Sequence, residues 1–155
     1  MTIFSITMKI YLAGPLFTSA EQEFNRQLCS ALKDAGHDVW LPQEHEPPER
    51  TAKAIFEEDV GGIEWAEVLV ANMDGPDPDS GTCWECGYAF RKKPIVLYRT
   101  DFRQAGDAEN TPFNLMLSQS ADMVILAPCA SPEQIAEQVC VALRELKGCN
   151  LPQER

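Results

Sequence analysis

Five short apolar runs, separated by stretches with helical periodicity, limit the folds open to this chain more than any other feature. The runs cover residues 9–13, 38–41, 68–73, 94–98 and 123–126. This regular alternation predicts an α/β fold, a doubly wound, five-stranded parallel sheet with helices on both faces and right-handed crossovers. Ligands bind such sheets beyond the carboxyl ends of the strands, so the loops after Leu12, Leu41, Met73 and Tyr98 are the candidate site.

Helix start and stop signals fill the intervals between the runs. Thr18 and Ser19 are alternative caps for a helix that ends near Gly36, and Ser131 caps a last helix that ends at Gly148. Further helices are predicted over about 51–65 and 112–120, and one more begins after Asp79 or Ser80. Residues 43–50 are predicted to form a polar, Pro-rich loop.

Length and charge limit the class of protein. A chain of 155 residues with 45% hydrophobic and 24% charged residues is predicted to be one soluble domain over residues 9–148, with an extension (1–8) and a tail (149–155). The net charge of −11 argues against a nucleic-acid polymer or an anionic membrane as partner. No apolar run approaches the roughly 20 residues of a membrane span, and the first residues lack a secretory pattern, so we expect a cytoplasmic location.

Glu85 is the only ionisable carboxylate between Asp79 and Arg91, in a helix that is otherwise largely apolar. Burying such a group destabilises the fold unless it has partners. One interpretation is that Glu85 faces solvent or has a structural partner. The other is a nucleophile in the first turns of a helix, where the helix dipole favours the ionised form. Position alone leaves both open.

Asp59 is the second unusual carboxylate, because it projects into an apolar stripe on the preceding helix. The members of that stripe are Ala52, Phe56, Val60, Ile63 and Ala66. Glu57, Glu58 and Glu64 are predicted to lie on the outer face. A bend near residues 61–62 would instead leave Asp59 exposed. Two carboxylates, one able to carry a proton, are what glycosidic bond cleavage through a covalent intermediate requires.

The six cysteines are expected to be reduced, mostly buried thiols. Cys83 and Cys86 have CxxC spacing, but a zinc site needs a second pair, which His37 and His45 are not spaced to supply. A redox CxxC normally opens its helix, whereas these two residues lie inside one. We therefore expect no metal site.

Four segments, taken together and in order, resemble the nucleoside 2-deoxyribosyltransferases. The resemblance runs from Lys9 to about Leu126, and the segment with Asp79 and Glu85 is its most specific part. The matching segments are residues 9–17 (KIYLAGPLF), 41–43 (LPQ), 79–89 (DSGTCWECGYA) and 114–116 (NLM). The resemblance implies a flavodoxin-like three-layer sandwich and exchange of the base of a 2′-deoxynucleoside without cofactor or metal.

The resemblance also implies roles for individual residues. Glu85 would attack C1′ of the deoxyribose, Asp59 would exchange a proton with the base, and Tyr11 would hydrogen-bond Glu85, although a strand tyrosine can simply pack. Asp79 would bind sugar hydroxyls, although a helix cap explains it equally well. Asn114 and Met116 would reach a neighbouring subunit's site in a homo-oligomer, a dimer or a hexamer built of dimers. Phe17 and Gln43 would line the base pocket, and Gly14 is the remaining implied substrate-binding residue.

Two other functions compete with this one. A nucleoside 5′-monophosphate N-glycosidase of the same fold needs a phosphate cradle, whereas Leu16 and Phe17 favour an uncharged 5′ end; Thr18, Ser19 and Arg103 could still serve a phosphate. A signalling receiver or flavin-binding module is disfavoured, because Gly14-Pro15 follows the first strand in place of acids or a phosphate loop. Purine or pyrimidine bases remain equally possible substrates.

Overall fold

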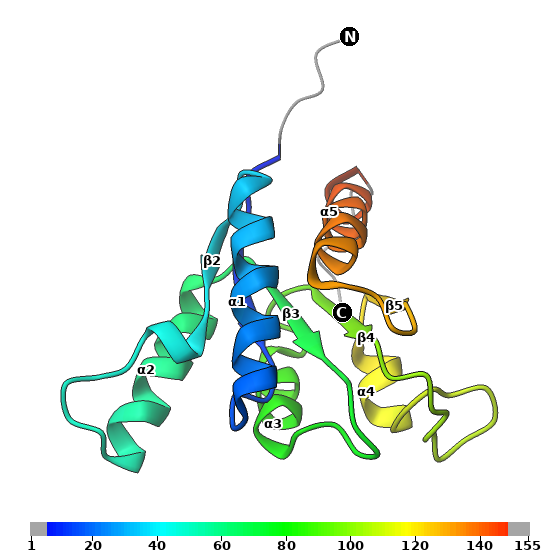
Figure 1. Ribbon diagram of the computed structural model, residues 1–155, viewed down its shortest axis with the longest axis horizontal. Coiled ribbons are helices and arrows are strands. Elements are labelled where there is room, and N and C mark those ends of the chain that lie inside the picture. The colour runs from blue at the N-terminus through cyan, green and yellow to red at the C-terminus, as the bar shows by residue number, and fades with distance from the viewer. Residues whose placement is uncertain (1–5, 149–155) are drawn as a thin grey trace, which may run out of the picture.

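Five parallel strands form one sheet in the order β2-β1-β3-β4-β5, as Figure 1 shows in the computed structural model, which describes residues 6–148. The strands are β1 (Lys9–Ala13), β2 (Asp38–Trp40), β3 (Val68–Asn72), β4 (Ile95–Arg99) and β5 (Met123–Leu126). The helices are α1 (Ser19–Asp34), α2 (Ala52–Trp65), α3 (Ser80–Ala89), α4 (Leu115–Ser120) and α5 (Pro132–Gly148), with a 3₁₀ turn, η1 (Pro42–Glu44). The predicted flavodoxin-like α/β fold is confirmed.

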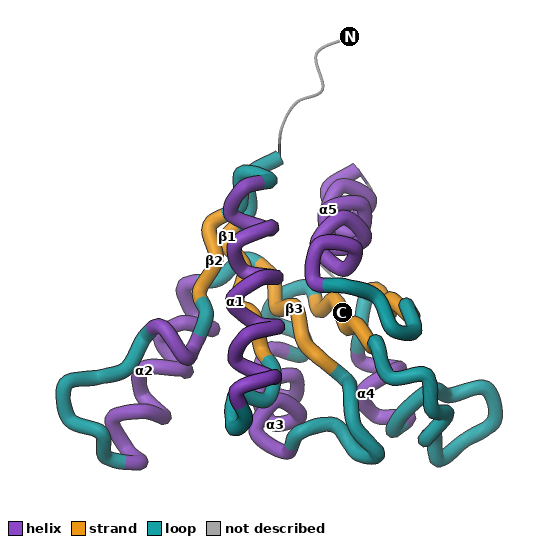
Figure 2. The backbone as a smooth tube through the Cα atoms, viewed as in Figure 1, coloured by secondary structure: helices purple, strands orange, loops and turns teal. Residues whose placement is uncertain are grey.

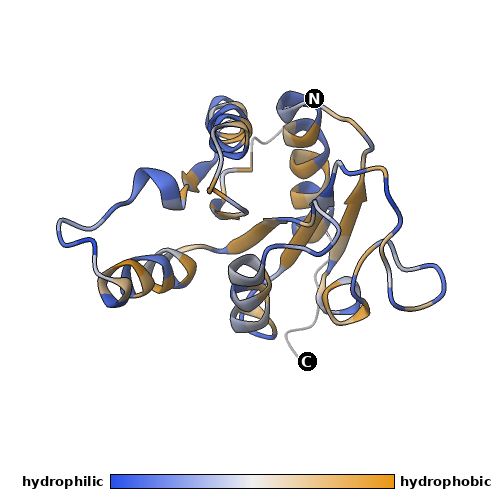
Figure 3. Ribbon diagram, turned by 60° about the horizontal axis from the view of Figure 1, so that its bottom comes forward, coloured by the Kyte–Doolittle hydropathy of each residue, from blue (hydrophilic) through white to orange (hydrophobic). Residues whose placement is uncertain are grey.

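Side chains alternate across each strand, so the two faces of the sheet build two separate cores. Ile10 and Leu12 of β1 face α1 and α5, which lie side by side over one face (Figure 1). Tyr11 and Ala13 face the opposite core, which α2, α3 and α4 cover. Figure 3 shows the apolar strands enclosed between these helical layers. The strands β1 and β3 are central and hydrophobic on both faces, as buried parallel strands are.

Strand order reverses between β1 and β3, because β2 lies on the far side of β1. The loops that follow these strands open at the same edge, which is the lower edge in Figure 2. Ligands of doubly wound sheets bind at such a reversal. The site is therefore expected between the segments that follow β1 and β3.

Several boundaries differ from the sequence prediction by a few residues. Thr18, not Ser19, caps α1 and forms a capping box with Glu21. The fourth strand extends to Arg99, and the short helix begins at Leu115 because Asn114 caps it. Met8, assigned to the extension, is buried and packs in the α1–α5 core. Cys149 and the rest of the predicted tail lie outside the described residues.

Candidate active site

The phenol of Tyr11 donates a hydrogen bond to Glu85 Oε1 at 2.6 Å, which joins β1 to α3 across the strand reversal. Tyr11 is fully buried because β1 turns it toward the α3 layer. Burial raises the pKa of Glu85 to about 7, the hydrogen bond from Tyr11 opposes that rise, and the charges of Asp59 and Asp79 add to it. Burial and the charge of Glu85 raise the pKa of Tyr11 as well, so the phenol remains a donor. The exposed alternative for Glu85 is wrong.

Asp59 is half-buried on α2, one turn before the point where the helix packs against the sheet. The helix continues unbroken through Gly61 and Gly62, so the predicted alternative of a bend is wrong. Burial raises the pKa of Asp59 to about 6, and the charge of Glu58 contributes. The charge of Asp59 reaches Glu85 and raises the pKa of that carboxyl group. Two carboxylates that titrate near neutrality therefore share one end of the sheet.

The predicted apolar stripe of α2 is only half correct. Ile63 and Ala66 are buried against the sheet, whereas Phe56 is 52% exposed and contacts Trp84 of α3 edge-on, with ring centroids 5.3 Å apart. The first half of α2 extends beyond the sheet edge, as Figure 1 shows, and cannot bury its apolar side chains there. Glu58 is half-buried, which differs from its predicted place on the outer face.

A cavity of about 280 Å³ brings Asp59 and Gln43 together. Leu16 reaches it from the loop before α1, Gln22 from α1, and His45 from the end of η1. The Gln43 amide is fixed at both ends: Oε1 accepts from Asn25 Nδ2 at 3.1 Å, and Nε2 donates to the Gln22 carbonyl at 2.9 Å. This cavity is large enough for a planar heterocyclic base.

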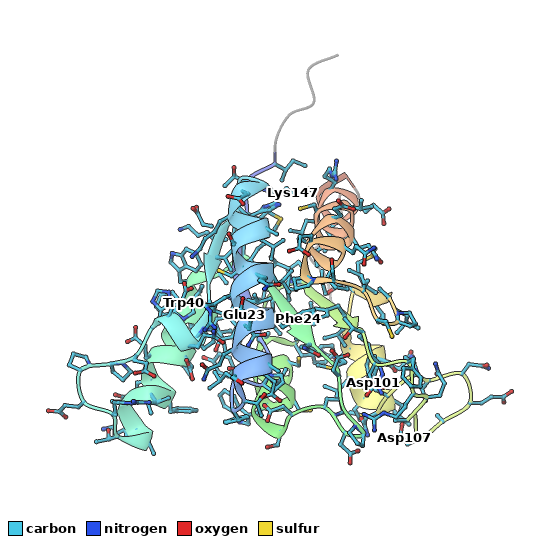
Figure 4. The ribbon with its side chains drawn as sticks, viewed as in Figure 1. Glu23, Phe24, Trp40, Asp101, Asp107 and Lys147 are labelled. Carbon is cyan, nitrogen blue, oxygen red and sulfur yellow. The ribbon has the colours of Figure 1, made fainter. Side chains whose placement is uncertain are left out.

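Sequence reasoning missed two neighbours of Gln43. Asn25 is a buried amide on α1, and it also donates to the Pro15 carbonyl at 2.9 Å. A polar residue on the inner, apolar face of an amphipathic helix was the available signal. His45 stacks on Trp40 with ring centroids 3.8 Å apart, and Trp40 is labelled beside β2 in Figure 4. Nothing in the loop sequence indicated that contact.

Neither Gly14 nor Phe17 lines the cavity that contains Gln43. A side chain at Gly14 would lie 3.2 Å from Asn72 Cβ, so the close approach of β1 to β3 requires a small residue there. Phe17 is 75% exposed and does not line the cavity with Gln43, whereas its neighbour Leu16 does. In this single chain the predicted base-pocket residues Gln43 and Phe17 are therefore not brought together.

Asp79 caps α3, as one of the two interpretations predicted. Its Oδ2 accepts from the Thr82 amide at 2.9 Å and from the Thr82 hydroxyl at 3.0 Å. Both bonds use the same oxygen, Oδ2. The cap sets the start of α3, and Glu85 lies in its second turn.

Asn114 and Met116 lie at the start of α4. The Asn114 side chain accepts from the Met116 amide at 2.9 Å and donates to Asp107 at 2.9 Å, while the Met116 side chain is 72% exposed. Both residues line a larger apolar groove of about 580 Å³ between α3 and α4, together with Asp77 and Cys83. Glu85 and Asp59 do not line this groove.

The thiols and acids of residues 6–148 form no group of three or more that could hold a metal ion. Cys83 and Cys86 are free thiols inside α3, and burial raises the pKa of Cys86 to about 12. Such a thiol is protonated and unreactive at neutral pH. Across residues 6–148, the helices are too short or too polar to span a membrane.

Comparisons with known proteins agree with this architecture. A 2-deoxyribosyltransferase from Bacillus psychrosaccharolyticus is 29% identical, with 76% of this chain and 85% of that chain covered and a TM-score of 0.64. An uncharacterised protein of Ureaplasma parvum is 30% identical over 161 residues, which cover 90% of this chain and 97% of that protein. A CMP N-glycosidase of Clostridium botulinum shares the fold at 16% identity and a TM-score of 0.60, with coverage of 86% and 98%.

The family comparison covers the segments that build the site. Residues 10–116 match the sequence profile described as nucleoside 2-deoxyribosyltransferase. This range begins in β1 and ends in α4, so it includes Tyr11, Asp59 and Glu85. Because the match covers more than half of the chain, this protein belongs to the nucleoside 2-deoxyribosyltransferase family of N-glycosidic bond enzymes.

Proposed function

We propose that this protein transfers 2-deoxyribose between nucleobases through a covalent deoxyribosyl ester of Glu85. The observation that carries the proposal is the 2.6 Å hydrogen bond that aims Glu85 from the buried phenol of Tyr11. A carboxylate held by a single donor keeps lone pairs for attack. Its position at the strand reversal is where a ligand of this fold binds.

The first half of the reaction breaks the bond between C1′ and the base. Glu85 supplies an electron pair to C1′, the electron pair of the breaking bond passes to the base nitrogen, and Asp59 gives that base a proton. The second half reverses these steps with a new base, whose proton returns to Asp59. Because two successive displacements occur at C1′, the β configuration is retained and the kinetics are ping-pong.

Both carboxyl groups can exchange a proton near neutral pH. The pKa values of about 7 for Glu85 and about 6 for Asp59 mean that a pair holding one proton is well populated near neutral pH. Because Glu85 has the higher pKa, that proton lies mainly on Glu85 in the free protein. The proposed roles, an ionised nucleophile and a protonated acid as in retaining glycosidases, therefore require the proton to move to Asp59 when the base binds. The cavity shared by Asp59 and Gln43 is the proposed base pocket.

The alternative substrate class is a nucleoside 5′-monophosphate, which a hydrolase of the same fold would accept. A phosphate binds best at a helix N-terminus. The helices that follow the two strands at the reversal, α1 and α3, already hold carboxylates at their N-termini: Asp79 at α3, and Glu21, which accepts from the Phe17 and Thr18 amides at 2.9 and 2.8 Å, at α1. A phosphate at either place would meet a like charge, which favours a substrate with an uncharged 5′ end.

We also propose that Asn114 and Met116 complete the site of a neighbouring copy in a dimer or a hexamer built of dimers. Met116 points away from its own chain and lies beside an apolar groove with Phe90, a surface that a second copy would cover. Two inactive variants, Glu85→Ala and Asn114→Ala, should regain part of the activity when they are mixed after dissociation. A fully active monomer would refute the shared site.

The decisive experiment for the transfer is mass spectrometry of the protein incubated with a deoxynucleoside and no acceptor. We expect a deoxyribosyl adduct on the peptide that contains Glu85. The adduct should be absent in Glu85→Gln and retained in Glu57→Gln, a change to an exposed glutamate of α2. A parallel assay supplies deoxynucleoside or deoxynucleotide with and without a second base, and hydrolysis of the phosphorylated substrate alone would overturn the proposal.

A further inference from the structure

Arg99, the last residue of β4, is a buried cation that crosses between two loops at the ligand-binding edge of the sheet. Its side chain is only 1% exposed. The guanidinium donates to the carbonyls of Met73 and Gly75, in the loop between β3 and α3, with 3.0 Å for the second bond. It also donates to the Arg103 carbonyl at 3.0 Å, in the loop between β4 and α4. One side chain therefore holds both loops.

Asp74 makes a second connection between the same two loops. Its carboxylate accepts from the Thr100 amide and the Thr100 hydroxyl, each at 2.6 Å, and from the Asp101 amide at 2.8 Å. Asp101, labelled in Figure 4 on the segment after β4, accepts in turn from the Gly75 amide at 3.3 Å and lies 3.7 Å from Arg99. Charge-assisted bonds of this kind are the strongest that a loop can form.

Both loops lead directly to residues of the proposed site. Between Gly75 and Asp79 the chain contains Pro76 and Pro78, whose fixed φ angles leave little freedom for the cap of the Glu85 helix. The second loop contains Asp107, also labelled in Figure 4, which holds Asn114 at 2.9 Å. A shift at the Arg99 connection would therefore move the start of α3 and the start of α4.

A buried arginine of this kind is hard to explain by stability alone. Desolvating a guanidinium costs free energy, and an apolar side chain of similar size is often neutral or better in such a place. Arg99 Nε, moreover, has no hydrogen-bond partner among residues 6–148. What the guanidinium provides is several donors in a fixed planar arrangement, which sets the relative position of the carbonyls that it contacts.

We propose that Arg99 is a positioning residue: by joining the loop after β3 to the loop after β4, it holds Asp79 where it would bind the sugar hydroxyls of this chain's own substrate, and Asn114 where it would complete a neighbour's site. This inference deepens the proposed function and rests on it. Arg99 touches no reacting atom in this arrangement. Its effect should therefore depend on whether the substrate carries the sugar hydroxyls that Asp79 would bind.

The test compares Arg99→Lys with the wild-type protein on three substrates: a 2′-deoxynucleoside, its 3′-deoxy analogue and its 5′-deoxy analogue. Lysine keeps the charge, but its donors share one nitrogen, so it cannot span the carbonyls that Arg99 contacts through two separate nitrogens. We expect kcat/KM for the complete substrate to fall about 10- to 100-fold, the range that small misplacements cost. For at least one analogue the fall should be several-fold smaller, because the lost contact is already missing. Arg144→Lys, on α5, is the matched control and should leave all three values unchanged.

Hydrogen exchange separates this inference from the proposed function. In Arg99→Lys we expect faster amide exchange over residues 73–83 and 100–115 and unchanged exchange in α1 and α5. Thr100→Val, which removes one hydroxyl bond to Asp74, should show the same pattern more weakly and serves if Arg99→Lys does not fold. An equal loss on all three substrates, or unaltered exchange in these loops, would overturn the positioning role. Absence of transfer by the wild-type protein would instead refute the proposed function, while the exchange result would still decide the connection.

Discussion

Tyr11→Phe removes one hydroxyl and tests whether Tyr11 tunes the charge of Glu85. The phenol donates to Glu85 Oε1 at 2.6 Å, a length typical of an O–H donor to a carboxylate. This bond lowers the pKa of Glu85 against the opposing effect of burial. Phenylalanine fills nearly the same space, so the packing of β1 against α3 is retained.

The magnitude follows from the strength of such a bond. A hydrogen bond to a charged group contributes about 1.5–3 kcal/mol. Since 1.36 kcal/mol corresponds to a tenfold change in ionisation, the ionised fraction of Glu85 on the acid side of its titration should fall roughly 10- to 100-fold. The direction is fixed: losing a donor to the carboxylate raises the pKa of Glu85, so the acid limb of the rate profile moves to higher pH.

The assay is kcat for base exchange measured across the pH range in both proteins. We expect a large loss at pH 6 that recovers as the pH rises. Tyr88→Phe is the matched control, because the Tyr88 hydroxyl also donates at 2.6 Å to a glutamate, the exposed Glu64, and its loss should leave the profile unchanged. A loss of equal size at every pH would refute the electrostatic reasoning and leave Tyr11 only a geometric role.

Three further predictions concern neighbouring residues. Glu85→Gln should stabilise the fold by about 3 kcal/mol at pH 8 and by nothing near pH 4, as denaturant titrations at both pH values can check. Burial raises the pKa of Glu85 from 4.5 to about 7, so wild-type stability is lost as the pH rises through that window. Gly62→Ala would place a methyl group inside the Trp40 indole, so it should lower the free energy of unfolding by about 1–3 kcal/mol in the same titration and should slow base exchange by displacing Asp59. Gly61→Ala, whose methyl group meets nothing within 4 Å, should change neither quantity. Asp79→Asn should raise activity on deoxynucleoside 5′-monophosphates relative to deoxynucleosides roughly fivefold, as measured by competition, and an unchanged ratio would remove the charge argument.

The sequence was sufficient to predict the strands and helices and to identify Glu85, one of the two residues in the central hydrogen bond. Apolar runs and caps identified β3 and α3, and the isolation of Glu85 in α3 marked it as a candidate because a buried carboxylate needs a partner. Helical periodicity alone left two positions open for Asp59, one inside the apolar stripe and one exposed beside a bend. Because α2 is unbroken, Asp59 stays on the partly buried side of the helix. Tyr11 was linked to Glu85 only by resemblance. Their 74-residue separation is bridged by the strand order, which no local pattern specifies.

The contacts that sequence reasoning missed have the same physical origin. The apolar run ends at Tyr98, so the sequence gives no sign that Arg99 is buried, because its burial depends on backbone carbonyls that carry no sequence signal. Asn25 similarly owes its role to Gln43, which a different loop brings next to α1. Local patterns predict which residues are unusual, whereas the packing of loops determines what those residues contact.

The balance of forces on Glu85 suggests how substrate binding would start the proposed reaction. Burial alone would keep this carboxyl group protonated and unable to attack, and several strong donors would make it a weak nucleophile. Burial together with a single donor, Tyr11, leaves the pKa of Glu85 at about 7, close to the value of about 6 for Asp59. A base that enters the cavity beside Asp59 removes water from that residue, which raises the pKa of Asp59 further. The shared proton then favours Asp59, so binding of the base both provides the acid and leaves Glu85 ionised for attack.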